Sequence, residues 1–245
     1  MEVIAYYILH YGADFLEASI KSIEPCVDKI VIFYSRTPTF GRRAAATLNP
    51  DTPEMLYKIA TEASDKVMWI EVTGIGDEAR HRNLIEEMAD GYDLILAVDS
   101  DEVWDTNELR AALDAAHQLN NQYIMISGFM HFWKSFNHVC IDHWTPVRIT
   151  NRKATNKIEQ GTVTGKVYHF SLAQREEVIR YKWSGIHGHQ DELRPNWLEE
   201  IFFEWKEGMN DVHPTTYGIW NVQNFDKTTM PPLLMQHKYY EKETI

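Results

Sequence analysis

Three carboxylates follow a run of apolar residues in the stretch LILAVDSDE, residues 94–102. Asp99, Asp101 and Glu102 stand at the end of a segment that reads as a buried strand. Hard carboxylate oxygens suit Mg²⁺ or Mn²⁺, and proteins usually hold such ions with one or two carboxylates together with substrate phosphates. The stretch therefore predicts a cation site with a diphosphate ligand. The alternative is structural, with Asp99 or Asp101 capping the following turn and Glu102 solvated.

Histidines are a second group of residues that could do chemistry, and most of the eleven lie in the second half of the chain. The stretch HGHQDE, residues 187–192, carries an H-x-H pair close to Asp191. Such a pair could bind zinc, but no further ligand has a recognisable spacing. We therefore favour a loop that closes over a ligand.

Strand and helix signals alternate in the first half of the chain, and they must position these side chains. Apolar strands are expected at 2–9, 28–35, 66–72 and 92–98, and amphipathic helices at 14–23, 52–64, 76–91 and 105–119. Thr52 reads as the N-cap of the second helix, with Pro53 at its first position. Continuously apolar strands that alternate with helices are typical of a doubly wound parallel sheet with helices on both faces. Ligands of such sheets bind beyond the carboxyl ends of the strands, where Asp99 and Asp101 fall.

The second half has a different pattern. Residues 122–139 are aromatic and alternating, and 145–152 and 166–171 are short extended runs, which together indicate antiparallel or irregular strands. Residues 172–186 and 194–208 read as amphipathic helices. The last part, with three prolines between 211 and 234, predicts an extended tail that packs on the domain.

The charge of the chain argues against a nucleic-acid partner, because 36 acidic against 24 basic residues give a net charge of −12 without a basic cluster. Cys26 and Cys140 lie far apart and form no CxxC pattern, which fits a reducing compartment. The N-terminus lacks the features of a signal peptide, and no segment approaches the ~18 apolar residues of a membrane span. We therefore expect a soluble, cytoplasmic protein with no transmembrane segment.

The stretches ILHYGADFLEASIKSI, VDKIVIFYS and ARHRNLIEEMADGYDLILAVDSDEVWD together resemble the nucleotide-binding half of glycosyltransferases with the GT-A fold, especially family 2-like enzymes. In that family a helix carrying Arg and Asn, here Arg82-Asn83, precedes a strand that ends in a D-x-D motif, here Asp99-Ser100-Asp101. The resemblance covers roughly residues 2–105. It implies a Rossmann-like, doubly wound and mostly parallel α/β sheet with a helical or irregular C-terminal part.

Carried over to this sequence, the resemblance implies a divalent ion, Mn²⁺ or Mg²⁺, that bridges the diphosphate of the donor. Asp101 would coordinate the ion, and Asp99 would contact the ribose or the sugar or share the ion. His169, at the end of a short strand before a helix, would supply a third ligand. Imidazole is more compatible with Mn²⁺ than with Mg²⁺.

The same resemblance implies the donor-binding side chains and the division of the chain. Arg82 would reach the donor, and His10 and Tyr34, at the ends of the first two strands, would border the nucleobase. Residues 1–120 would be the nucleotide-sugar-binding half of a single GT-A domain. Residues 121–210 would form the acceptor side and complete the metal site, and 211–245 the packed tail.

The acceptor side and the catalytic base are less marked in the sequence. An inverting sugar transfer needs a carboxylate base near the acceptor hydroxyl, for which we take Asp191 first and Glu192 or Asp142 as alternatives. Trp133 and Trp144 offer apolar ring faces for an acceptor sugar, with core packing as the alternative. A retaining mechanism stays open.

The leading hypothesis is a metal-dependent glycosyltransferase that moves a sugar from a UDP- or GDP-sugar to a carbohydrate or glycoconjugate acceptor. A metal-dependent phosphoesterase or nucleotidyltransferase would share the acidic ligands and the sheet. A noncatalytic module that binds a nucleotide sugar or carbohydrate is the third interpretation. The sequence identifies neither the sugar nor the acceptor.

Overall fold

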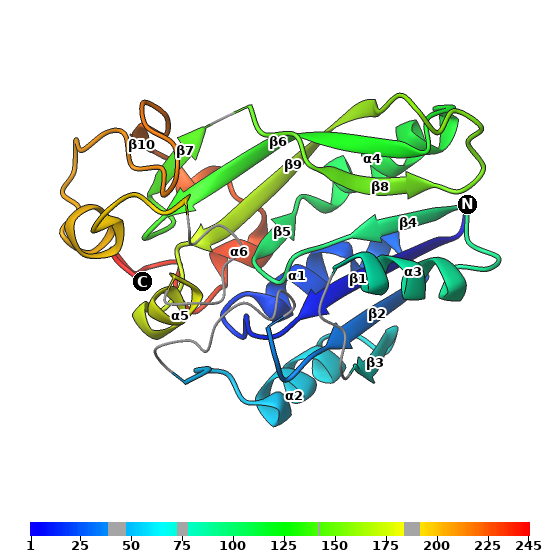
Figure 1. Cartoon of the computed structure of the whole chain (residues 1–245), viewed down its shortest axis with the longest axis horizontal. Coiled ribbons are helices and arrows are strands. Elements are labelled where there is room, and N and C mark those ends of the chain that lie inside the picture. The colour runs from blue at the N-terminus through cyan, green and yellow to red at the C-terminus, as the bar shows by residue number, and fades with distance from the viewer. Residues whose placement is uncertain (39–47, 73–77, 142, 184–191) are drawn as a thin grey trace.

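Four parallel strands form the first half of the sheet in the computed structural model, which describes residues 1–38, 48–72, 78–141, 143–183 and 192–245, with backbone only for 78–82. These strands are β1 (Val3–Leu9), β2 (Lys29–Tyr34), β3 (Val67–Glu71) and β4 (Leu94–Ala97), in the order β3-β2-β1-β4 (Figure 1). The predicted parallel core is therefore confirmed. Its carboxyl ends gather at one edge, because all four strands run in the same direction.

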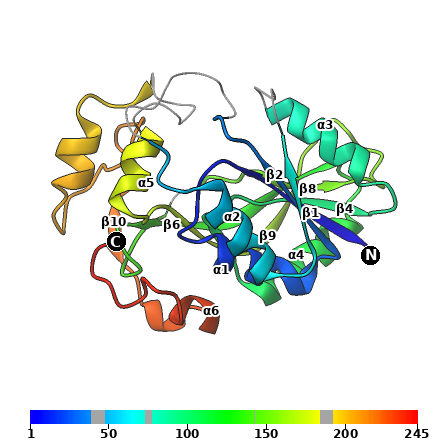
Figure 2. The same ribbon diagram turned by 90° about the horizontal axis from the view of Figure 1, so that it is seen from below.

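Helices cover both faces of this parallel part. Helices α1 (Leu16–Ile23), α2 (Pro53–Ala63) and α4 (Thr106–Gln118) pack on one face, and α3 (Glu78–Met88) packs on the other (Figure 2). Alternate strand residues make both interfaces, so Ala5 and Ile32 face the first group of helices while Ile4 and Val31 face α3. A short 3₁₀ turn, η1 (Glu24–Cys26), follows α1.

Local signals fix where the helices begin. The Thr52 hydroxyl accepts a hydrogen bond from the Met55 amide, and Pro53 is the first residue of α2, as predicted. The Asp105 carboxylate accepts from the amides of Asn107 and Glu108 and begins α4. Each cap satisfies amides that the helix itself cannot pair.

The second half of the sheet is mixed, which corrects the expectation of a mostly parallel sheet. Strand β6 (Tyr123–Trp133) pairs antiparallel with β8 (Val147–Asn151) and β7 (His138–Ile141), and parallel with β9 (Gly161–Leu172). Strand β8 joins this part antiparallel to β4, and β10 (Val222–Asn224) extends it beside β7. The sequence predicted extended structure here but not a twelve-residue β9, of which only residues 166–171 stood out.

A short strand after β4 ties the two halves together. Strand β5 (Glu102–Trp104) pairs antiparallel with β9, and Glu102 lies opposite His169. The Phe170 amide also donates a 2.8 Å hydrogen bond to the Asp101 carbonyl oxygen. The acidic segment thus lies against a strand that follows it by almost 70 residues in the chain.

The C-terminal third contains short helical elements. These are α5 (Glu176–Tyr181), the π-helical η4 (Trp197–Phe203), the 3₁₀ turn η5 (Lys227–Thr229) and α6 (Pro232–Met235). Helix α5 is shorter than the predicted helix over 172–186, because β9 continues to Leu172. Within the described ranges, every helix is too short or too polar to span a lipid bilayer.

The last residues pack on the domain next to the loop that follows β1. Met230, Leu234 and Tyr239 join a buried aromatic cluster around Phe15. The Tyr239 hydroxyl donates to Asp14 at 2.8 Å, and the Arg175 guanidinium bridges Asp14 at 2.7 Å and Asp51 at 2.5 Å. The tail and the start of α5 therefore fix the β1–α1 loop from two sides.

Gly12 in that loop touches the acidic segment directly. Its φ of +128° is a conformation that side chains with a Cβ rarely adopt, and an added Cβ would lie 2.8 Å from the Ser100 Cβ and closer still to its hydroxyl. We expect Gly12→Ala to lower the free energy of unfolding by about 3 kcal/mol or more, through backbone strain and steric clash together. Urea denaturation measures the loss.

Gly91 is the matched control for this change. It has a φ of +87°, but an added Cβ would meet no atom within 4 Å, so Gly91→Ala should cost only the strain of about 1–2 kcal/mol. The double variant Gly12→Ala with Ser100→Gly should recover the steric part of the loss. Equal losses in Gly12→Ala and Gly91→Ala would show that the contact with Ser100 is unimportant.

Candidate functional site

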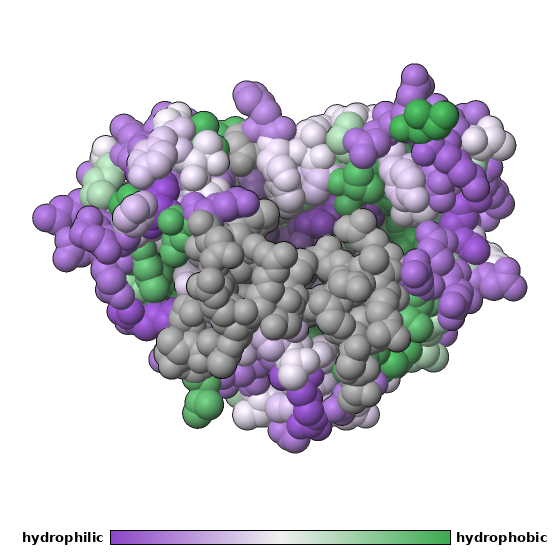
Figure 3. Space-filling view, viewed as in Figure 1, coloured by the Kyte–Doolittle hydropathy of each residue, from purple (hydrophilic) through white to green (hydrophobic). Residues whose placement is uncertain are grey.

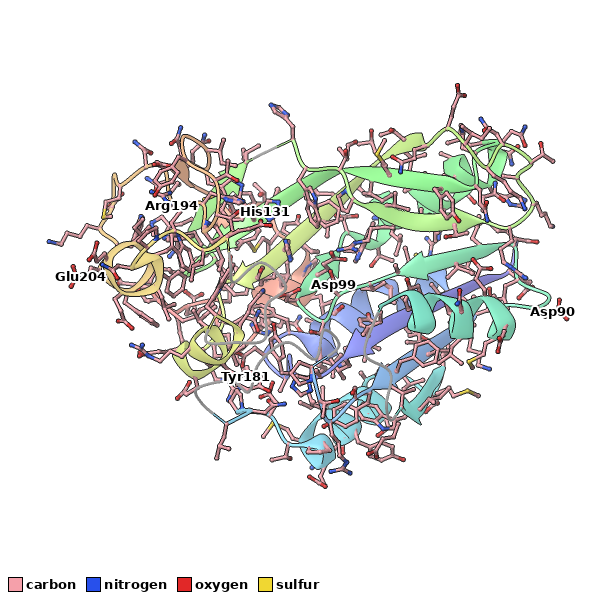
Figure 4. All side chains as sticks on the ribbon, viewed as in Figure 1. Asp90, Asp99, His131, Tyr181, Arg194 and Glu204 are labelled. Carbon is pink, nitrogen blue, oxygen red and sulfur yellow. The ribbon has the colours of Figure 1, made fainter. Side chains whose placement is uncertain are left out.

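The acidic segment leaves the sheet at the carboxyl end of β4 and forms a tight turn. The Glu102 amide donates to the Asp99 carbonyl oxygen at 3.0 Å, which closes the turn. Ser19 of α1 donates to the same oxygen at 3.3 Å, and the Ser100 hydroxyl reaches the Tyr11 carbonyl oxygen at 3.4 Å. In Figure 4, Asp99 lies near the centre of the molecule, between the two parts of the sheet.

Asp101 is a buried carboxylate whose charge is balanced by neighbouring donor and cationic groups. One oxygen accepts a 3.0 Å hydrogen bond from the Gln174 amide and lies 3.8 Å from Lys182 Nζ, and the other lies 3.5 Å from His169 Nε2. Burial by itself would raise the pKa of the Asp101 carboxyl, but His169 and Lys182 outweigh it and hold the pKa well below its usual range. Asp101 is thus an ionised carboxylate with little contact with water.

His169 lies beside Asp101, as the proposed metal pair requires. It comes from β9, and its Nδ1 atom lies 3.0 Å from Nδ1 of His131 on β6. Two ligands at right angles around an ion with bonds of ~2.1 Å are about 3 Å apart, close to the 3.5 Å between Asp101 Oδ1 and His169 Nε2. This spacing suits two neighbouring ligands of one divalent ion, with His169 binding as the neutral imidazole, and their metal role stays a prediction.

Asp99 has different hydrogen-bond partners from Asp101 and is more exposed. Its carboxylate accepts a 2.6 Å hydrogen bond from Arg148 of β8, and the same guanidinium also bonds to Glu102, with Nε at 3.1 Å. Asp99 keeps 54% of its side chain exposed, whereas Glu102 is completely buried. The described contacts thus join Asp99 to Arg148 and not to the Asp101–His169 pair, so a shared ion would need a different arrangement. Among the described residues, no group of three or more His, Cys, Asp and Glu side chains is arranged to hold a metal.

The net pKa shift of Glu102 is opposite to that of Asp101. Loss of water raises the pKa of the Glu102 carboxyl to about 7, against the opposing effect of Arg148, and the negative charge of Asp99 adds to the increase. The alternative expected from the sequence, a solvated Glu102, is therefore wrong, because β5 carries this residue into the interior.

Two cavities adjoin these residues. The first, the Arg148 cleft, has a volume of about 390 Å³ and lies between α3 and the strands, with Tyr6, Asn83, Asp99, Tyr123 and Arg148 among its lining residues. The second, the aromatic pocket, has a volume of about 780 Å³. Its walls include Trp144, Trp183, Trp220, His131, His169 and His213. Figure 3 shows a hollow lined by hydrophilic side chains near the centre of the displayed face.

The predicted donor-side residues have distinct surroundings. His10 is buried, with Nδ1 at 2.8 Å from the Ser35 carbonyl oxygen and Nε2 at 2.6 Å from the Tyr181 hydroxyl, and burial lowers the pKa of its ring. Tyr34 is also buried and stacks on Trp69 with the ring centres 5.0 Å apart, so its ring belongs to the core. Arg82 lies in α3, but its side chain is outside the described part.

The predicted acceptor-side residues differ in their burial and surroundings. Trp133 is fully buried against Trp197 and Phe202, so core packing, the alternative reading, holds for this residue. Trp144 is 45% exposed and lines the aromatic pocket. Asp191 and Asp142 lie outside the described residues, and the exposed Glu192 lines the same pocket as Trp144.

Sequence reasoning did not find Gln174 and Lys182. Both contact Asp101, and Lys182 is almost completely buried, with Nζ donating to the Ser171 hydroxyl at 2.6 Å. No local signal could have singled them out, because they follow Asp101 by more than 70 residues and lie in a segment that reads as an ordinary amphipathic helix.

Comparisons with known proteins give distant structural likenesses. No family model matches the chain, and no curated protein sequence matches it. Similar solved structures include glucosyl-3-phosphoglycerate synthase from Mycobacterium tuberculosis in complex with Mn²⁺, uridine-diphosphate and phosphoglyceric acid, at 12% identity and a TM-score of 0.34. That match covers 53% of this chain and only 43% of the synthase.

Two further structures have similar scores. HddC from Yersinia pseudotuberculosis, complexed with GMP-PN, has 9% identity and a TM-score of 0.43, over 74% of this chain and 98% of HddC. The glycosyltransferase GlyE of Streptococcus pneumoniae TIGR4 has 15% identity and a TM-score of 0.30, over 52% of this chain and 29% of GlyE. Likenesses this distant show no activity for this chain.

The ion pair between Arg148 and the buried Glu102 can be tested by substitution. Arg148→Met removes the cation that holds down the pKa of Glu102, so the buried carboxyl should take up a proton. We expect the lost charge-assisted hydrogen bonds to lower the free energy of unfolding by about 1.5–3 kcal/mol at pH 7. Adding Glu102→Gln should recover part of it. As a control, Arg36→Met removes a guanidinium from the exposed pair with Glu71 and should cost at most about 1 kcal/mol. Comparable losses for Arg148→Met and Arg36→Met would contradict the buried pair.

The lowered pKa of Asp101 predicts a pH dependence. Because its folded-state pKa lies below the ordinary value of 3.8, ionised Asp101 contributes stability that is present above that value and is lost as the pH falls below it. The stability difference between the wild type and Asp101→Asn should therefore be largest near neutral pH and should shrink below about pH 4. Glu102 takes up its proton in both proteins, so its effect on stability largely cancels when the variant is compared with the wild type. A difference that does not change between pH 7 and pH 3 would refute the assignment.

Proposed function

We propose that this protein is a glycosyltransferase that takes a sugar from a nucleoside-diphosphate donor, with a divalent ion, Mn²⁺ or Mg²⁺, held at Asp101 and His169. The observation that carries the proposal is the buried, ionised Asp101 carboxylate at the carboxyl edge of the parallel strands. Its oxygen lies 3.5 Å from His169 Nε2. Ligands of sheets with this connectivity bind at that edge.

The residues present fit the ion as part of a substrate complex. Divalent ions of this kind are commonly held by one or two protein ligands, with substrate phosphates and water completing the shell. Asp101 and His169 would be the two protein ligands. When bound, the ion would neutralise charge that develops on the leaving diphosphate.

Several of the chain's own groups would support the donor. Lys182 adds a positive charge 3.8 Å from one Asp101 oxygen, and His169 lies beside the other oxygen. Its hydrogen bond to Ser171 and its burial restrict its motion, which suits a group that must act in one position. Asp99, on the rim of the Arg148 cleft, keeps exposed surface through which a ribose or sugar hydroxyl could donate to it.

A thermal-shift titration tests the proposal. At 100 times its dissociation constant, a ligand that binds only the folded state adds about 2.7 kcal/mol, which for a chain of this size raises the melting temperature by about 5–11 °C. UDP- and GDP-sugars should produce such a shift in the presence of Mn²⁺, and only a small one in EDTA. Asp101→Asn should abolish the Mn²⁺-dependent part.

Asp114→Asn is the control, because it removes one carboxylate from an exposed position on α4. It should leave the ligand-induced shift unchanged. Slow hydrolysis of the donor sugar should accompany binding in the wild type. Binding without any turnover would indicate a noncatalytic module, and cleavage of simple phosphate esters without a sugar would indicate a phosphoesterase. A shift that survives Asp101→Asn would overturn the ligand assignment.

A further inference from the structure

The two oxygens of the Asp101 carboxylate have different neighbours. Oδ2 accepts a 3.0 Å hydrogen bond from the Gln174 amide and lies 3.8 Å from Lys182 Nζ. Oδ1 lies 3.5 Å from His169 Nε2. Because the chain's own donors already occupy Oδ2, a divalent ion would bind to Oδ1 and to His169, whose ring binds a metal in its neutral form.

Lys182 is held beside Asp101 by contacts with the end of β9. Its Nζ donates to the Ser171 hydroxyl at 2.6 Å and to the Ser171 carbonyl oxygen at 3.5 Å, and only 7% of its side chain is exposed. These contacts do not involve Asp101. The ammonium therefore keeps its position when a ligand binds to the carboxylate.

The charge of Lys182 leaves the proposed ion site close to neutral. Asp101 supplies one negative charge, and Lys182 balances it from 3.8 Å away. The next carboxylates along the chain, Asp99 and Glu102, share the guanidinium of Arg148. A divalent ion that arrived alone would thus meet a fixed positive charge in a largely buried site, where repulsion between like charges is stronger than in water.

We infer that Lys182 makes this site select the complex of a divalent ion with a diphosphate over the free ion. A diphosphate brings several negative charges, which balance the ion and attract the ammonium as well. The inference rests on the proposed function for the ion at Asp101 and His169, and it adds a requirement on how that ion is bound.

The number of protein ligands supports the same conclusion. An ion of this kind takes about six ligands. Among the residues that the structure describes, no group of three or more His, Cys, Asp and Glu side chains is arranged to hold a metal. Asp101 and His169 would therefore leave most positions open, and the charged oxygens of a diphosphate can occupy some of them.

Positive coupling between the ion and the diphosphate follows from this arrangement. Each of the two ligands raises the affinity of the site for the other by the same factor. The charge of Lys182 acts on them in opposite directions, because it repels the ion and attracts the diphosphate. A side chain with a purely structural role would, when removed, weaken the binding of both.

Lys182→Met removes the charge and keeps an unbranched side chain. The affinity of the protein for Mn²⁺ alone, measured from the electron paramagnetic resonance of the free ion, should rise at least tenfold. The affinity for UDP and GDP in excess Mn²⁺, measured by calorimetry, should fall at least tenfold. Circular dichroism checks that the variant folds. Lys182→Gln, which can still donate to the Ser171 hydroxyl, should show the same opposite changes.

Lys134→Met is the matched control, because Lys134 is also partly buried and its Nζ donates to the Phe202 carbonyl oxygen at 2.9 Å. Both affinities should remain those of the wild type. Saturation of the wild type by micromolar Mn²⁺ without a nucleotide, or changes of the same sign in both Lys182 variants, would overturn the inference and leave the proposed transfer standing. Opposite changes in a protein that hydrolyses no nucleotide sugar would support the inference and contradict only the transfer.

Discussion

The antiparallel pairing of β5 with β9 is the interaction on which the candidate site depends. It places residues 102–104 against residues 167–169 at the point where the parallel part of the sheet ends. A buried carboxylate costs several kcal/mol unless nearby groups compensate its charge. The compensating groups of Asp101 are His169, Gln174 and Lys182, which all come from the end of β9 or the segment after it. One strand pairing therefore supplies both the position of the carboxylate and the partners that keep it ionised.

The same pairing gives three nearby carboxylates three different environments. Asp101 is buried among cationic and donor groups, which lower its pKa, whereas Glu102 is buried with a net loss of solvation, which raises its pKa to about 7. Asp99 remains half exposed and shares Arg148 with Glu102. Asp101 has one oxygen 3.5 Å from His169 Nε2. That is why the proposed ion is assigned to it and to His169.

Sequence reasoning succeeded where structure depends on neighbouring residues. The four parallel strands, the cap at Thr52 and the position of the D-x-D stretch at the carboxyl edge all follow from local periodicity and side-chain chemistry. The mixed second half of the sheet could not be predicted from such local signals, because contacts between distant segments decide pairings such as that of β6 with β9. Trp133 and Trp144 illustrate the limit: the sequence predicts the same role for both, but tertiary packing against residues such as Trp197 buries Trp133, whereas Trp144 stays 45% exposed.

The two aspartates of the D-x-D stretch also differ in how readily they can exchange partners. Arg148 bonds to both Asp99 and Glu102, so a ligand hydroxyl that displaced it from Asp99 would leave it paired with the buried glutamate. Such an exchange exposes no uncompensated charge and should cost little. Asp101 has no equivalent freedom, because its partners are themselves buried or fixed by β9. The geometry thus suits Asp99 to a replaceable contact with substrate and Asp101 to a charge that stays in place throughout a reaction.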